Sequence, residues 1–73
     1  MPDRSSDFRQ TTAAAELHVI ADTVERQRER VAAVAAPFLG SEREDIASMV
    51  FEAERQLLIA TRALRRAITS LER

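Results

Sequence analysis

An unbroken heptad repeat between residues 46 and 71 constrains the fold of this chain more than any other feature. Apolar residues recur there in alternating steps of four and three: Ile46, Val50, Ala53, Leu57, Ala60, Leu64, Ala67 and Leu71. This spacing lines them up on one side of a helix and is typical of a helix that packs lengthwise against other helices. Large residues alternate with three alanines, an arrangement that favours close approach of two antiparallel helices. The repeat describes a packing surface and not a reaction.

A second heptad repeat covers the first half of the chain. Its members are Ala13, Leu17, Ile20, Val24, Gln27, Val31, Val34 and Phe38. Gln27 is the polar exception, and it has two interpretations. A buried amide can fix register and partner number, as a single Asn does in coiled coils, or the helices can be open here and bind something polar. We favour the first interpretation. Asp22 and Arg26, and likewise Glu25 and Arg28, are spaced to form ion pairs on the helix surface.

Local signals predict where the two helices begin and end. Residues 1–10 are polar and are expected to form a flexible tail, followed by a helix over about 11–36, with Asp7 as an alternative, earlier start. Pro37 disfavours helical geometry in the residue before it, and Gly40 suits a turn over 37–41. Ser41 and Glu44 have the spacing of a capping box, which predicts a second helix over about 42–72. A turn this short makes the two helices antiparallel neighbours.

The predicted fold class is all-α: an antiparallel two-helix hairpin that dimerises into a four-helix bundle. Ordering each residue costs about 1.5 kcal/mol, and two helices that meet along one seam bury too little apolar area to offset that cost for the whole chain. We therefore expect a homodimer, with another helical protein as the alternative partner. The predicted association core comprises Leu17, Ile20, Val24, Gln27, Val31, Val34, Val50, Leu57, Leu64 and Leu71.

Three large apolar residues, Phe51, Leu58 and Ile59, fall outside the repeat. Their position on a second side of the helix predicts a possible second interface.

The sequence contains no recognisable catalytic, cofactor or metal site. It has no Cys, one Gly and one His, so it offers no thiolate ligands and no glycine-rich phosphate loop. His18, Asp22 and Glu25 recur at about one-turn spacing, but a surface histidine is the favoured interpretation of His18. The chain also lacks an apolar run of about 18 residues and a conventional secretory signal. We expect a non-enzymatic, cytoplasmic protein that acts through protein–protein association as a scaffold, adaptor or regulatory subunit.

Arginines suggest an alternative function in nucleic-acid binding. All eleven basic residues are Arg, and Arg55, Arg62, Arg65 and Arg66 gather on the outer side of the second helix. In a symmetric dimer such stripes double and can contact phosphates. The competing interpretation is that these arginines solvate an outer face and pair with the twelve acidic residues.

The predicted turn Phe38-Leu39-Gly40 resembles the signature turn of the Trp-Xaa-Gly helical hairpins exported by type VII secretion systems. Phe38 stands where that family has Trp, and the chain has no Tyr for the family's C-terminal export signal. The resemblance implies a helical hairpin that is exported with a helical partner.

Overall fold

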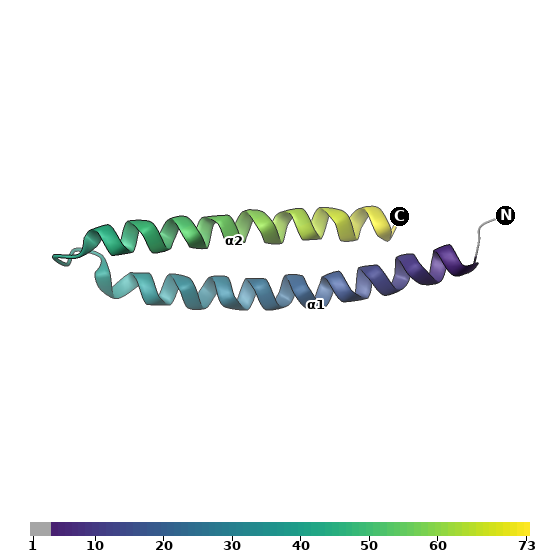
Figure 1. Ribbon diagram of the computed structural model, residues 1–73, viewed down its shortest axis with the longest axis horizontal. Helices are drawn as coiled ribbons and strands as arrows, with labels where there is room; N and C mark the ends of the chain where they lie inside the picture. Colours follow the sequence, from purple (N-terminus) through teal and green to yellow (C-terminus); the bar gives the residue numbers. More distant parts are fainter. Residues whose placement is uncertain (1–3) are drawn as a thin grey trace.

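The computed structural model of the protein is an all-helical, antiparallel hairpin (Figure 1). It describes residues 4–73, with side chains from Ser6 onward. Helix α1 spans Arg4–Ala35, a short 3-10 helix η1 spans Ala36–Phe38, and helix α2 spans Glu44–Leu71. The molecule extends 63 Å along its longest axis and 14 Å or less across it. The predicted helical hairpin is confirmed.

Helix α1 begins at Arg4, seven residues before the start predicted from the sequence. Residues 1–3 of the expected tail lie outside the described part of the chain. Helix propagation is favourable here because residues 4–36 contain neither Gly nor Pro, and the Thr11 hydroxyl donates to the Asp7 carbonyl (2.9 Å). The first turns of α1 project beyond the end of α2 (Figure 1), so Phe8 remains 75% exposed.

The turn between the helices follows the expected sequence signals but caps α2 differently. Gly40 has φ +71°, the left-handed conformation that favours glycine. The Ser41 hydroxyl donates to the Phe38 carbonyl (2.7 Å) and accepts the Arg43 N–H (3.1 Å). The predicted capping box is therefore wrong: α2 begins at Glu44, and its N-cap Arg43 makes no side-chain cap. Ser41 lies two residues before the N-cap position, so its hydroxyl does not cap the first turn of α2.

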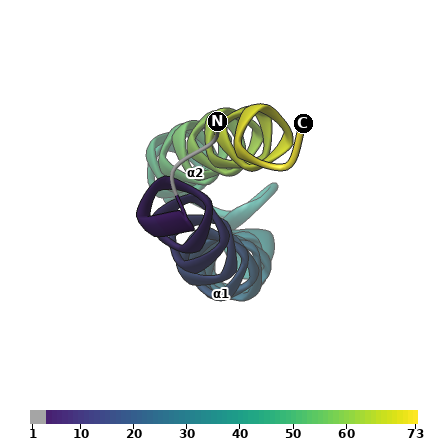
Figure 2. The same ribbon diagram turned by 90° about the vertical axis from the view of Figure 1, so that its right-hand side faces the viewer.

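The two helices meet along a seam of small residues. Residues seven apart form a row along a helix, and one row from each helix is the most buried. We call these two rows the inner seam: Ala14, Ala21, Arg28 and Ala35 on α1, and Ala47, Glu54, Thr61 and Ile68 on α2. Three of these alanines, Ala21, Ala35 and Ala47, have no exposed surface. Small side chains let two helices approach closely. Figure 2 shows α1 and α2 side by side, seen from the end at which the termini lie.

An ion-pair cluster interrupts the inner seam near its middle. The Arg28 guanidinium donates to the carboxylates of Glu54 on α2 and Glu25 on its own helix. The Arg28 and Glu54 side chains are 23% and 18% exposed, so water screens this pair only partly. The pair also sets the alignment of the helices, because it places residue 28 of α1 level with residue 54 of α2.

Candidate association surface

The predicted association core lies one row away from the inner seam in both helices. Val24 and Val31 of α1 and Leu57 and Leu64 of α2 are half-buried, and Val34 is 59% exposed. The other members divide in the same way: Leu17, Val50 and Leu71 are half-buried, and Ile20 and Gln27 are exposed. The hairpin alone therefore does not enclose the residues that carry most of its aliphatic surface.

The alanines of the α2 repeat also lie one row away from the inner seam. The sequence pattern suggested that Ala53, Ala60 and Ala67 mediate close helix approach, but all three are exposed in the hairpin. Close approach to α1 instead uses the neighbouring row, which includes Ala47 and Thr61.

Both displaced repeats lie on the same broad side of the hairpin. On each helix, the exposed residues of the repeat directly precede residues of the inner seam in the sequence. A step of one residue back corresponds to the same direction of rotation about each helix axis, viewed along its chain direction. Because the two helices run in opposite directions, the same sense of rotation about each axis leads to the same side of the pair. We call this side the open apolar face. Its exposed members are Ile20, Gln27, Val34, Ala53, Ala60 and Ala67, and half-buried aliphatic residues border them.

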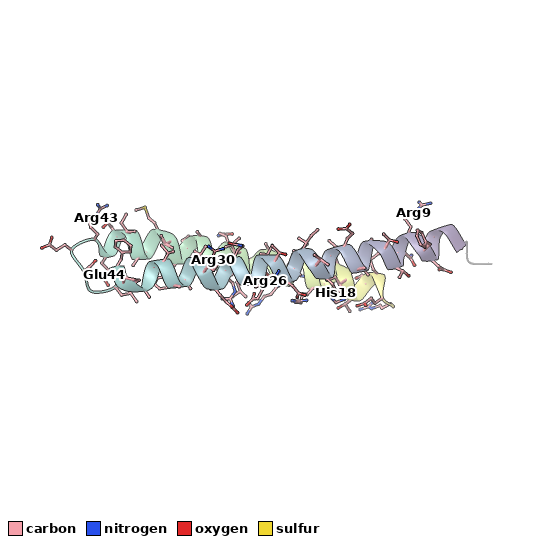
Figure 3. The ribbon with its side chains drawn as sticks, turned by 90° about the horizontal axis from the view of Figure 1, so that it is seen from below. Arg9, His18, Arg26, Arg30, Arg43 and Glu44 are labelled. Carbon is pink, nitrogen blue, oxygen red and sulfur yellow. The ribbon has the colours of Figure 1, made fainter. Side chains whose placement is uncertain are left out.

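The opposite side of the hairpin is polar and carries two further polar contacts between the helices. Arg65 of α2 donates to Asp22 of α1 (3.0 Å), and His18 Nε2 lies 3.5 Å from a Glu72 carboxylate oxygen. Figure 3 looks onto α1 with α2 behind it, and His18 lies at the lower border of this view. The expected partner of Asp22 was Arg26, which instead donates to the Thr23 hydroxyl (3.3 Å). The contact expected between Glu25 and Arg28 is confirmed.

Hydrogen bonds from arginine shift the pKa values of two carboxyl groups. Arg28 holds the pKa of Glu25 below its ordinary value of 4.5, and Arg43 likewise lowers the pKa of Asp45. The same contacts, first with Glu25 and then with Glu54, raise the pKa of Arg28. These pKa shifts all favour the charged forms of the groups, as expected for ion pairs that contribute to the fold.

The three residues predicted to form a second interface do not share one environment. Phe51 and Leu58 are half-buried in the row beside the inner seam, on its polar side. Ile59 is 47% exposed on the outer side of α2. The structure does not bring these residues together as one surface, and a second interface at Ile59 stays a prediction.

Arginines gather at the open end of α2. A shallow depression there is lined by Arg62, Arg65, Arg66 and Arg73 with the hydroxyl residues Thr61, Thr69 and Ser70. Arg65 is engaged by Asp22. The Thr61 and Thr69 hydroxyls donate to backbone carbonyls of their own helix, so the remaining arginines and Ser70 are the groups in this depression that are best placed to contact a ligand.

Within residues 4–73, no group of three or more His, Asp or Glu side chains has the geometry to hold a metal ion. Neither α1 nor α2 contains a sufficiently apolar stretch to cross a membrane.

The hairpin exposes more surface than a compact protein of its size. Its accessible surface is 5629 Å², whereas about 4,500 Å² is expected for a folded monomer of this mass. The difference, about 1,100 Å², exceeds the roughly 800 Å² that each partner buries in a typical stable interface. Among the described residues, Ile68 is the only large aliphatic residue that is buried.

Comparisons with known proteins found no matching family model, no matching curated protein and no matching solved structure. The resemblance to the Trp-Xaa-Gly hairpins therefore rests on the residues of the turn.

The contact between Arg28 and Glu54 was missed in the sequence, although a signal for it existed. Ala14, Ala21 and Ala35 form a regular row in which Arg28 occupies the remaining position. A single charge in a row of alanines indicates a position that needs a partner of opposite charge on the facing helix.

Proposed function

We propose that this protein is a non-catalytic helical hairpin that acts by associating with another helical surface through its open apolar face, as a scaffold, adaptor or regulatory subunit. The observation that carries the proposal is the position of the large aliphatic residues. They lie beside the inner seam and not within it, and Ile20 and Val34 are 43% and 59% exposed. Aliphatic surface is favourably removed from water, at about 25 cal/mol per Å². A helical partner with a matching apolar stripe supplies that burial.

The composition of the open apolar face supports the same function. Its exposed rows carry no charged residue; Gln27 is the one polar member. Exposed alanines between larger residues leave shallow hollows into which side chains of a second helix layer can pack. A bundle core has these properties, whereas a solvent-facing helix surface is normally rich in charge.

Substitution of Ala60 by Glu tests this function. Ala60 is exposed in the hairpin, so Ala60→Glu should be nearly neutral if the face is solvated. If the face is an interface, the new charge is buried without a partner, and association should weaken about 100-fold or more, which corresponds to about 2.7 kcal/mol.

Ala33→Glu is the matched control for that substitution, because Ala33 is also exposed but lies on the outer side of α1. Sedimentation and circular dichroism over a dilution series would report association and helicity. Equal behaviour of Ala60→Glu, Ala33→Glu and the natural sequence would refute the proposed function.

A second candidate function, phosphate-dependent binding of nucleic acid, is favoured by the arginine-lined depression on α2. Replacing Arg62, Arg66 and Arg73 with Gln should then abolish binding to a generic RNA or DNA duplex and remove its salt dependence. The same change should leave helicity and association intact, because none of the three lies on the open apolar face. Absence of salt-dependent binding by the natural sequence would dismiss this candidate.

A further inference from the structure

We infer that a second copy of this chain covers the open apolar face, with the turns of the two hairpins at opposite ends and a two-fold axis at the level of Gln27. This inference rests on the proposed function, because it names the partner that covers the proposed binding surface.

The exposed residues of α1 are arranged symmetrically about Gln27. Ile20 and Val34 each lie seven residues from Gln27, one before it and one after it, and both are exposed. A two-fold axis at Gln27 places α1 antiparallel to α1 of the second copy. Ile20 of each copy then contacts Val34 of the other. The two Gln27 amides meet at the axis, where an amide can both donate and accept a hydrogen bond.

The same axis gives a complementary arrangement on α2. Because Arg28 pairs with Glu54, the level of Gln27 on α1 corresponds to about residue 55 on α2. Antiparallel packing of two α2 helices about that level places Leu57 of each copy against Ala53 of the other. It likewise brings Val50 against Ala60. Large side chains thereby meet small ones, as close helix packing requires.

The axis also accounts for Leu39, an exposed aliphatic residue in the turn. Leu39 is 54% exposed in the hairpin and lies at the turn end, whereas Leu71 lies at the opposite end of α2. With the turns at opposite ends, Leu39 of one copy reaches the level of Leu71 of the other. The apolar contact then extends over the full length of α2.

Charge favours this orientation over one with both turns at the same end. The turn half of the hairpin, residues 28–54, holds six acidic residues and three arginines; the remainder holds six acidic residues and eight arginines. With the turns together, halves of like charge would lie side by side within about 10 Å, close to the screening length at physiological salt. With the turns at opposite ends, each acidic half faces a basic half.

A second copy also matches the amount of surface that needs to be covered. Each hairpin exposes about 1,100 Å² beyond the expectation for a compact monomer, and a symmetric contact removes equal areas from both copies. A pair of hairpins that each bury about that much falls within the range of stable dimers.

Spin labels on single-cysteine variants of the full chain test both the partner and its orientation. The chain has no Cys, so Glu42→Cys gives one label per copy at the turn. Glu44, the first residue of α2, lies about 11 helical rises from the level of the axis, and residue 42 lies just beyond it, so pulsed electron resonance should find a label separation of about 35–40 Å. Turns at the same end would give about 20 Å or less.

Cross-linking supplies an independent measurement at the axis. Gln27→Cys should join two copies through a short bis-maleimide linker, whereas the control Glu29→Cys, which lies on the polar side of α1, should not. Glu29 is exposed and two residues away, so both thiols react equally with a monofunctional maleimide.

The outcomes separate this inference from the proposed function. A dimer with the short label separation, or without the Gln27→Cys cross-link, overturns the orientation and leaves the proposed function standing. A poorly helical monomer overturns the second copy as partner while the open face still requires another protein. A fully helical monomer overturns both.

Discussion

The inner seam and the open apolar face divide two tasks that a larger protein assigns to a single core. The seam holds the helices together with alanines and one charged pair, Arg28 and Glu54. The face, one row away, carries the valines and leucines. Alanine burial contributes little hydrophobic free energy, whereas each large aliphatic residue contributes about 1.5–3 kcal/mol when fully buried. The seam therefore determines which sides of the helices meet. Most of the hydrophobic free energy that the chain can gain would come from burial of the face.

This division has a consequence for folding. If the face supplies most of the stabilising burial, the hairpin becomes stable only when the face is covered. Folding and association are then one event, and apparent stability depends on protein concentration. At a fixed protein concentration, substitutions in the seam and on the face should therefore change stability by different amounts.

The largest effect is expected from Leu64→Ala, which removes a large side chain at the border of the open face. Leu64 is half-buried in the hairpin and becomes enclosed when the face is covered. The free energy of unfolding should fall by about 2–5 kcal/mol, as for enclosed leucines. Chemical denaturation followed by circular dichroism measures this change. Ile59→Ala, on the outer side of α2, is the control and should cost less than about 1 kcal/mol. Equal losses in the two variants would mean that the face is solvated.

A smaller effect is expected from overfilling the seam with Ala47→Leu. Ala47 has no exposed surface, so the larger side chain must push the helices apart, at a cost of about 1–3 kcal/mol. Ala33→Leu adds the same atoms on the outer side of α1 and should change stability by less than about 0.5 kcal/mol. Thermal unfolding of both variants makes the comparison. A tolerated leucine at residue 47 would show that another row forms the seam.

The smallest effect is a pH dependence that originates at the charged cluster in the seam. Because Arg28 lowers the pKa of Glu25 in the folded state, the unfolded chain binds more protons as the pH falls below about 4.5. The stabilisation is therefore complete above the unfolded pKa and is lost as the pH falls through the folded pKa. Arg43 adds a contribution of the same sign at Asp45.

Arg28→Gln should flatten part of this pH dependence, measured as the melting temperature between pH 3 and pH 7. Arg30→Gln is the control, since Arg30 is exposed and lies outside the seam. Parallel pH profiles for the natural sequence and Arg28→Gln would show that the cluster contributes nothing to acid sensitivity.

Much of the fold could be predicted from the sequence, because its signals are local. The heptad spacings, Pro37 and Gly40 indicate two helices and a short turn, and a short turn permits only antiparallel neighbours. The helix boundaries were less accurate. Helix α1 extends back to Arg4 without tertiary support from α2, and α2 begins two residues later than its capping signal suggested.

The candidate surface was identified in part. The residues of the open apolar face were recognised as an apolar stripe, but they were expected to face each other within the hairpin. Phe51 and Leu58, predicted as part of a second interface, are half-buried beside the seam. For both groups, a rotation of each helix about its own axis relates the expected position to the observed one.

The sequence by itself determined the number of helices, their antiparallel order and the composition of each row. Only the tertiary structure decided which row turns toward the neighbouring helix. Heptad spacing and turn length specify the direction of a helix axis but leave rotation about that axis free. That rotation is set by contacts between the helices: alanines such as Ala21 and Ala47 permit the closest approach, and Arg28 meets Glu54 only when these rows face each other. The wide apolar stripe is compatible with several rotations, whereas these two contacts select one.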